Sequence, residues 1–303
     1  MRYSFNDVCP APLPGTRYFD FRPDDAPNPD SSYRVFVHVP EGEAPEDGWP
    51  ALYMTDGNAV IGTAVDALRA QASYPRGTGI GPGVIVAIGY PTDAAYDPFR
   101  RSWDLSPPPG AEYPPFHDGG PVVRTGGAEF FLSFLLDTLR PWLHARLPVN
   151  GGAESLFGHS FGGLFTLYAL ATRPAAFRNW IAASPAIYWE DEVIRTYLDR
   201  MPPTGWENLS GRVLLSAGEF EGGAPAPFER GRSDETERLA HRRKIRTIHL
   251  AEELSRDILR LTGRAEAASF EQHPGENHMS VLPVAVNRAV QNAFRLSPQD
   301  LLK

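Results

Sequence analysis

The chain has 303 residues, of which 42% are hydrophobic and 22% charged, as in an ordinary soluble globular protein. Its formal net charge of -8 disfavours binding to nucleic acid or to an anionic membrane surface. Cys9 is the single cysteine, so no disulfide can form within the chain, which fits a reducing compartment. The first residues lack a charged start followed by an apolar run, and no stretch approaches the roughly 20 apolar residues of a membrane span. We therefore expect a cytoplasmic protein with no membrane partner, or a periplasmic one if an export signal has been removed.

The first part of the chain alternates strand-like and helical segments. Residues 33–39 alternate apolar and polar side chains, as a half-buried strand does. Residues 83–88 form a continuous apolar run, which is typical of a strand buried on both faces of a sheet. Further strands are predicted at 16–22 and 51–54, and a helix at 60–71. This alternation favours a sheet with helices packed against it.

Residues 89–124 differ from the segments on either side. They are rich in Pro, Gly, Tyr and Arg, and their apolar residues follow no clean period. A long irregular segment inside a compact domain is usually functional or disordered. Its aromatic residues argue against disorder; they are Tyr96, Phe99, Trp103, Tyr113 and Phe116. We predict loops that lie over a functional site.

The second part of the chain repeats the strand–helix alternation. A helix is predicted over 125–147, with a kink or restart at Pro141. The segments that follow are strands at 155–157, 180–183, 213–217 and 268–271, helices at 164–171, 235–261 and 281–294, and a polar loop at 221–233. With no internal repeat and no break in composition, we predict a single α/β domain over 1–303. Its mostly parallel central sheet would carry helices on both faces, with the loops at about 89–124 and 221–233 inserted over the site.

The segment Gly158-His159-Ser160-Phe161-Gly162 has the pattern G-x-S-x-G. It lies between a short apolar run and a long apolar helical pattern. In this context a serine is held on a tight strand-to-helix turn with its hydroxyl exposed above a sheet. The glycines leave room where a side chain would collide with the crowded backbone. The pattern predicts that Ser160 is a nucleophile for acyl transfer.

A serine hydroxyl needs a base within hydrogen-bond reach, and the base needs an orienting group. When the serine lies on such a turn, the acid and then the histidine follow it along the chain. His278 follows the last predicted strand and precedes the last helix, so it is the predicted base. Glu221, just after the strand at 213–217, is the first choice for the acid, and Glu219 is the second. A serine–histidine dyad without an acid remains an alternative.

The oxyanion that forms during acyl transfer needs preorganised donors. The backbone N–H of Phe161, after the nucleophile, is one predicted donor, and that of Asn58, after the strand at 51–54, is the other. The chain contains neither a Walker sequence nor a dinucleotide-binding fingerprint, and its His and Cys residues do not cluster at metal-ligand spacing. We therefore expect neither a cofactor nor a metal.

Several segments together resemble the putative-esterase branch of the α/β-hydrolases, and in particular its enterochelin (catechol-trilactone) esterases. The segment at 101–107 resembles an Arg-x-x-Asp-Leu/Tyr-Thr-Pro sequence of the siderophore-esterase members. The other matching segments are 50–59, 126–131, 156–165, 183–189 and 274–278. They run in family order from about residue 16 to 294, nearly the whole chain. The resemblance implies the α/β-hydrolase fold, with Ser160 as nucleophile and His278 as base.

The resemblance also implies a substrate. Members of this family hydrolyse ester bonds of the siderophore backbone, often on the ferric complex. A ferric tris-catecholate is anionic, so a site for it needs local cations in this acidic protein. Arg100, Arg101 and Arg124, with Trp189 from one of the matching segments, are the predicted substrate-binding residues. Two further candidate cations in the second loop are Arg230 and Arg232.

We therefore predict a serine esterase that hydrolyses a ferric or iron-free catecholate siderophore through an acyl-enzyme, with a role in iron acquisition. One alternative is an esterase for another ester, phenolic (feruloyl) or carbohydrate, because the superfamily includes feruloyl esterases and mycolyltransferases. A second alternative is a siderophore-binding protein that keeps the fold without turnover. The expected partner is a small-molecule ester.

Overall fold

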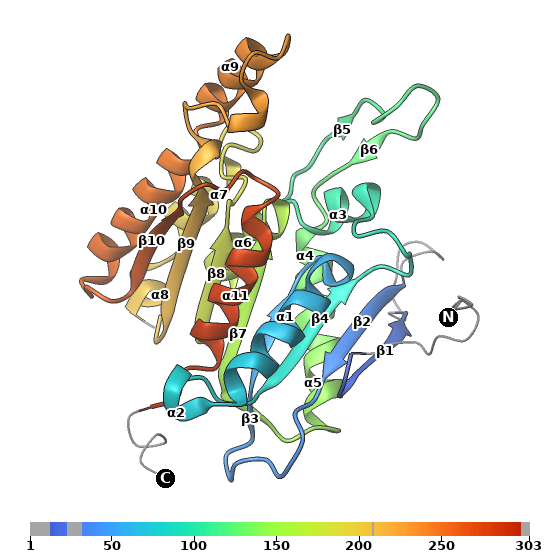
Figure 1. Ribbon diagram of the computed structural model, residues 1–303, viewed down its shortest axis with the longest axis vertical. Coiled ribbons are helices and arrows are strands. Elements are labelled where there is room, and N and C mark those ends of the chain that lie inside the picture. The colour runs from blue at the N-terminus through green and yellow to red at the C-terminus, as the bar shows by residue number, and fades with distance from the viewer. Residues whose placement is uncertain (1–12, 23–31, 208, 298–303) are drawn as a thin grey trace, which may run out of the picture.

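The computed structural model describes residues 13–22, 32–207 and 209–297, so Cys9 and the N-terminal segment searched for an export signal lie outside it. An eight-stranded sheet has the order β1-β2-β4-β3-β7-β8-β9-β10 (Figure 1). The strands are β1 (Thr16–Phe21), β2 (Tyr33–His38), β3 (Trp49–Met54), β4 (Val84–Gly89), β7 (Val149–His159), β8 (Asn179–Ala183), β9 (Arg212–Gly218) and β10 (Ala268–His273). β1 and β2 are antiparallel to their neighbours, whereas β4, β3, β7, β8, β9 and β10 are parallel to one another.

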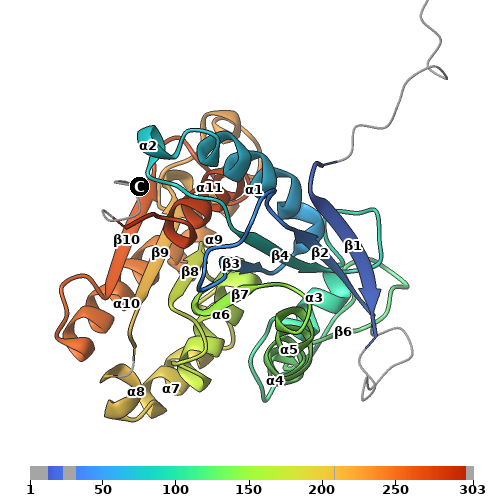
Figure 2. The ribbon, with the colours of Figure 1, turned by 90° about the horizontal axis from the view of Figure 1, so that it is seen from below.

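Helices cover both faces of this sheet (Figure 2). One face packs on α1 (Gly57–Ala72) and α11 (Val281–Ala293). The other face packs on the remaining core helices, α4 (Ala128–Ser133), the π-helical turn at 134–139, α5 (Arg140–His144), α6 (Phe161–Thr172), α7 (Val193–Arg200) and α10 (Thr247–Thr262). The α/β-hydrolase fold predicted from the sequence is thereby confirmed.

Alternation along the central strands divides the core into these two layers. In β4, Val84, Val86 and Ile88 belong to the cluster with α6. Ile85 and Ala87 belong to the cluster with α1 and α11. Because both faces are buried, β4 reads in sequence as one continuous apolar run, and the same holds for β3.

The helix predicted over 235–261 is divided in two. α9 (Glu235–Ile245) ends at Arg246, whose φ of 51° is left-handed, and α10 begins at the next residue. None of the residues of α9 is buried, whereas α10 buries one face. The charged sequence continues across the break without a Pro or Gly, the residues that most clearly mark a helix end.

The loop predicted at 89–124 contains regular structure. Asp97 caps α3 (Pro98–Asp104) by accepting hydrogen bonds from the amides of Phe99 and Arg100, at 3.1 and 2.9 Å. A short hairpin follows, β5 (Glu112–Tyr113) with β6 (Val123–Arg124). Three further short helices were not predicted from the sequence: α2 (Pro75–Thr78), α7 and α8 (Pro203–Glu207).

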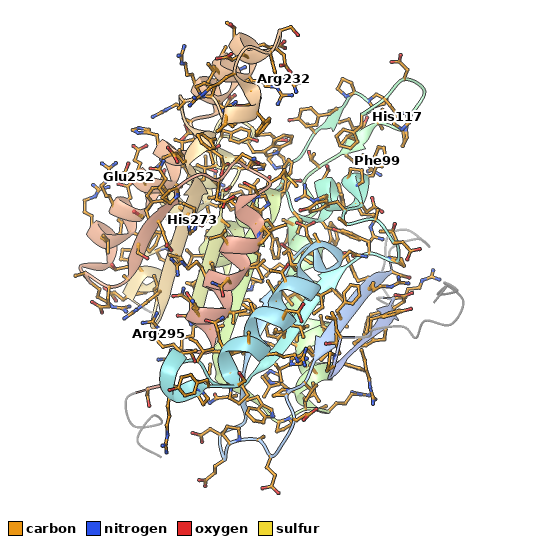
Figure 3. The ribbon with its side chains drawn as sticks, in the orientation of Figure 1. Phe99, His117, Arg232, Glu252, His273 and Arg295 are labelled. Carbon is orange, nitrogen blue, oxygen red and sulfur yellow. The ribbon has the colours of Figure 1, made fainter. Side chains whose placement is uncertain are left out.

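Two projections extend beyond the carboxyl edge of the parallel strands. Figure 1 shows the β5–β6 hairpin with α3 on one side of this edge and α9 on the other. In Figure 3, Phe99 and His117 mark the first projection and Arg232 the second. No helix in the part of the chain described here has the length and apolar character needed to cross a bilayer.

Candidate active site

Ser160 lies on a sharp turn between β7 and α6, with φ 60° and ψ −116°. A Cβ at Gly158 would lie 2.0 Å from the carbonyl oxygen of Gly162, and a Cβ at Gly162 would lie 2.2 Å from Oγ1 of Thr55. A side chain at Gly158 would therefore collide with the backbone, and one at Gly162 would require the Thr55 side chain to move. The Ser160 amide donates to the carbonyl of Ala183 at 2.9 Å, which fixes the turn to the end of β8.

The structure brings together the three side chains predicted from their chain order. Nε2 of His278 lies 3.1 Å from Oγ of Ser160, and Nδ1 lies 2.6 Å from Oε2 of Glu221. These distances allow a neutral imidazole to donate from Nδ1 to the carboxylate and accept the serine proton at Nε2. The His278 side chain is 43% exposed, so a substrate can reach it.

Glu221 ends a short 3₁₀ turn that follows β9, and its side chain is almost fully buried. Oε1 accepts hydrogen bonds from the Gly218 amide at 2.7 Å and from Oγ of Ser184 at 2.5 Å. Glu219, the second choice for the acid, instead accepts from the Gly275 amide at 2.7 Å. The geometry therefore favours Glu221 as the partner of His278.

His159 is a second histidine beside the triad. Its ring is buried against that of His278, with the ring centroids 4.7 Å apart. Burial, reinforced by the neighbouring His278 and Arg101, lowers the pKa of His159 to about 3. We infer that this imidazole is uncharged near pH 7 and that its ring packs against the ring of His278.

The buried His159 predicts a loss of stability in acid. Its folded pKa lies below the ordinary value of 6.5, so the unfolded chain takes up a proton first as the pH falls. The contribution of neutral His159 to the free energy of unfolding is fully present above pH 6.5. It declines toward pH 3, by about 3 kcal/mol between pH 7 and pH 4. Urea unfolding across this range should show a flatter profile for His159→Gln. The same substitution at the exposed His117 should leave the slope unchanged, and an unchanged slope in His159→Gln would contradict the prediction.

The two predicted oxyanion donors lie at neighbouring helix starts. Phe161 is the first residue of α6 and Asn58 the second residue of α1, where backbone N–H groups have no acceptor within the helix. The Asn58 side chain accepts from the Tyr90 amide at 2.9 Å and donates to the carbonyls of Tyr90 and Thr92 at 3.0 and 2.8 Å. Its side chain is thus occupied, which leaves the backbone amide as the group available to a substrate.

A buried ion pair holds the loop between β3 and α1. Nε and Nη2 of Arg101 donate to the two carboxylate oxygens of Asp56 at 2.9 and 3.0 Å. Asp56 has a left-handed φ of 54° and lies two residues before Asn58. Burial opposes the charge on Arg101, but Asp56 outweighs it, so the pKa of Arg101 is raised. Arg101, predicted to bind substrate, is therefore reassigned to holding this loop.

Removing the charge of Asp56 should expose the function of this pair. Asp56→Asn keeps the side-chain shape and tolerates the left-handed backbone, but it leaves Arg101 buried without a counter-charge. We expect a loss of about 3 kcal/mol in the free energy of unfolding. We also expect a fall of at least about tenfold in kcat/KM, because the Asn58 amide is displaced.

The matched control is Asp20→Asn, which breaks the bidentate pair with Arg34 far from the site, where Asp20 is 41% exposed. This control should cost less than about 1 kcal/mol and leave kcat/KM unchanged. Equal effects of the two substitutions, measured by urea unfolding and ester hydrolysis, would contradict the assignment.

The other predicted cations lie in different surroundings. Nη2 of Arg100 lies 3.6 Å from Asp104, and its guanidinium stacks over Tyr33 and Tyr90, so Arg100 is also committed within the chain. Arg124 is 67% exposed on β6 and lies over the Trp103 ring, and its Nε lies 3.9 Å from Oε1 of the equally exposed Glu112, a loose surface pair. In the second loop, Arg232 pairs with Asp234, whereas Arg230 is exposed. Arg124 and Arg230 thus remain candidate cations for a substrate.

Trp189 belongs to an aromatic row that starts at the nucleophile turn. Its ring centroid lies 4.7 Å from that of Phe161 and 5.1 Å from that of Tyr113 on the hairpin. The Tyr113 hydroxyl also donates to Glu190 at 3.2 Å. The row therefore links the β5–β6 hairpin to the residue that follows Ser160. The prediction that Trp189 contacts substrate agrees with this placement.

Two residues of the site, Asp56 and Ser184, were not predicted from the sequence. Each directly follows a short run of buried residues, and such positions carry functional groups in parallel sheets. That signal was present, but an Asp-Gly and a Ser-Pro pair are also ordinary turn sequences. In the described ranges, no group of three or more His, Cys, Asp or Glu side chains could hold a metal ion.

The fold and the nucleophile turn define an α/β hydrolase with a serine–histidine–glutamate arrangement. The model of the family described as "Putative esterase" matches residues 26–256, and the chain belongs to this family. The chain is 33% identical over 287 residues to the ferri-bacillibactin esterase BesA of Bacillus subtilis, covering 94% of this chain and 91% of that protein.

Two further relatives are fungal. The siderophore enterobactin esterase of Emericella nidulans is 35% identical over 290 residues, 88% of this chain and 91% of that protein. The solved structure of the siderophore hydrolase EstA from Aspergillus nidulans is 31% identical and superposes with a TM-score of 0.78, over 96% of this chain and 98% of that one. The resemblance to siderophore esterases predicted from the sequence is thus confirmed.

Proposed function

We propose that the chain hydrolyses ester bonds in the backbone of a catecholate siderophore, with Ser160 as nucleophile. The observation that carries the proposal is the continuous chain of hydrogen bonds from Ser160 through His278 to Glu221 at the nucleophile turn. The names of the curated relatives, among them a ferri-bacillibactin esterase and an enterobactin esterase, support the substrate class.

Acylation begins when Oγ of Ser160 attacks the ester carbonyl carbon while Nε2 of His278 takes the hydroxyl proton. The carboxylate of Glu221 stabilises the imidazolium through the bond to Nδ1. The amides of Asn58 and Phe161 donate to the oxyanion. The tetrahedral intermediate collapses by breaking the bond to the ester oxygen, which takes the proton from His278 and leaves as an alcohol.

Deacylation repeats these steps with water. His278 removes a proton from the water as its oxygen attacks the acyl carbon. The second intermediate then breaks its bond to Oγ of Ser160, which recovers its proton from His278. The carboxylic acid product leaves and the enzyme returns to its starting state. A cyclic trilactone substrate would be opened to a linear ester carrying one new hydroxyl and one new carboxylate.

The surroundings of Ser160 suit an aromatic, anionic substrate. The row of Phe161, Trp189 and Tyr113 offers ring faces and edges to a catechol. The exposed Arg124 on the hairpin is a cation that a ferric tris-catecholate could draw away from its loose surface pair with Glu112, whose closest N–O distance is 3.9 Å.

The direct test is product analysis by liquid chromatography and mass spectrometry. The purified protein would be incubated with a ferric catechol trilactone, with the iron-free trilactone and with a feruloyl ester, and Ser160→Ala would serve as the blank. The proposal predicts linear ester products from at least one trilactone at a higher kcat/KM than for the feruloyl ester. Cleavage of the feruloyl ester alone would assign the protein to phenolic esters. Tight siderophore binding without product would make it a binding protein.

A further inference from the structure

Each oxygen of the Glu221 carboxylate is hydrogen-bonded to a different side chain. His278 occupies Oε2 at 2.6 Å, and the hydroxyl of Ser184 donates to Oε1 at 2.5 Å. Ser184 is only 1% exposed, so water does not compete for this bond. A hydrogen bond to a charged acceptor shielded from water is about twice as strong as one between neutral groups. The hydrogen-bonded chain from the nucleophile therefore extends one side chain beyond the acid.

The backbone of Ser184 is held in an unfavourable conformation. Its φ of 44° is left-handed, which a serine rarely adopts and a glycine adopts freely. The residue directly follows β8, and its amide donates to the carbonyl of Ser216 on β9 at 2.7 Å. Strained residues of this kind persist where the surrounding structure fixes them, and they concentrate at functional sites. A hydroxyl at this position thus has a cost that glycine would avoid.

We propose that Ser184 is a positioning residue of the active site, which fixes the Glu221 carboxylate against His278 through its hydroxyl. The inference rests on the proposed function of Ser160 and His278 and adds a fourth side chain to them. The Ser184 hydroxyl acts in two ways: it holds the rotamer of Glu221, and it stabilises the ionised carboxylate. Losing it should leave Glu221 more mobile and more ready to share a proton with His278.

The second effect has a definite sign. The hydroxyl donates to the carboxylate, so it stabilises the Glu221–His278 pair without the added proton more than the pair with it. Without this donor, the pair should take up its proton at a higher pH. Since catalysis needs a neutral His278, the acid limb of the kcat/KM profile should move to higher pH. A purely structural role of Ser184 would lower activity without moving the limb.

Other charged or titratable groups also lie near this pair. His159 packs on His278, and burial lowers its pKa to about 3, below the range of the acid limb. Burial, with a smaller contribution from Glu221, raises the pKa of Tyr188. Glu219 binds the amide of Gly275. A cavity of about 320 Å³ behind Glu221 is lined by Arg242, Arg243, Arg246, His249 and Glu252. All of these groups are retained in a Ser184 variant, so a difference from the wild type reports on Ser184.

The test uses two substitutions that both remove the hydroxyl but differ in whether they relieve the backbone strain. Ser184→Ala keeps the strain at φ 44°, whereas Ser184→Gly relieves it. Both should lower kcat by about tenfold with little change in KM, and both should move the acid limb up by about one pH unit. The control is Ser255→Ala, which removes a buried hydroxyl bonded to the Glu252 carbonyl and should change neither quantity.

A second readout does not need turnover. The short Nδ1–Oε2 bond of 2.6 Å should place the His278 Nδ1 proton at low field in the ¹H NMR spectrum. The pH titration of this signal should shift upward, or the signal should broaden, in both Ser184 variants. If the wild type cleaved no ester, the proposed function would fail and this titration would still decide the inference. An unshifted acid limb and titration in both variants, or defects in Ser184→Ala alone, would overturn it.

Discussion

Replacing Ser160 by alanine is expected to lower kcat for ester hydrolysis by about 10⁵-fold to 10⁶-fold. The substitution removes the atom that forms the acyl-enzyme and leaves the amides of Asn58 and Phe161 in place. Residual hydrolysis would come from these donors and from substrate binding. Initial rates with an aryl ester over a range of substrate concentrations would measure the loss.

Stability and binding separate this effect from misfolding. Alanine has the same backbone restriction as serine at the φ of 60°, so the free energy of unfolding should change by less than about 1 kcal/mol. Binding of a non-hydrolysed siderophore analogue should persist. Hydrolysis at more than about a hundredth of the wild-type rate would rule Ser160 out as the nucleophile.

Glu221→Gln carries the second largest expected effect, a loss of about 10⁴-fold in kcat. The amide keeps the volume of the carboxylate but removes the charge that stabilises the His278 imidazolium. It also presents an NH₂ group to surroundings that offer three donors, which are the Gly218 amide, Ser184 and His278. The His278 tautomer with its proton on Nε2 would then be favoured, and it cannot accept the Ser160 proton.

Glu219→Gln is the matched comparison, because it lies two residues away on the same 3₁₀ turn. Glu219 accepts from the Gly275 amide in the loop that leads to His278, so we expect a loss of about tenfold at most. Steady-state kinetics of the two variants on one ester would rank them. A larger loss in Glu219→Gln would make Glu219 the acid, whereas less than about a tenfold loss in both variants would leave a serine–histidine dyad.

Chain order and strand ends were sufficient to predict the components of the triad. Ser160, Glu221 and His278 each follow a strand of the parallel sheet, and the carboxyl ends of parallel strands meet at one edge. Long-range pairing was therefore predictable from local patterns. The sheet and its two helical layers were also predictable from local patterns, because strands buried on both faces, such as β4, form a continuous apolar run.

Pairings between distant polar residues outside the triad were not predictable. Arg101 was assigned to substrate because a net negative protein needs cations for an anionic ligand, but its guanidinium is bound to Asp56, 45 residues earlier. Ser184 meets Glu221 across 37 residues. Neither contact leaves a periodic signal in the sequence, since each depends on the side-chain positions that the complete fold creates.

The break between α9 and α10 was missed for a different reason. A left-handed residue usually marks its place with Gly or Asn, and here it is Arg246. Both helices carry many charged residues, so the continuous run of charged residues concealed the change in burial. Their separation matters to the site because Arg242 of α9 donates to the carbonyl of Phe220, next to Glu221, at 2.7 Å.

The most direct measurement is the identification of the acyl-enzyme. The protein would be mixed with an aryl ester that deacylates slowly, quenched in acid, digested and analysed by mass spectrometry. The proposed mechanism predicts one added acyl group on the peptide that contains Ser160, formed at the rate of the initial burst and absent from Ser160→Ala. An acyl group on a different residue, or steady turnover by Ser160→Ala at the wild-type rate, would contradict it.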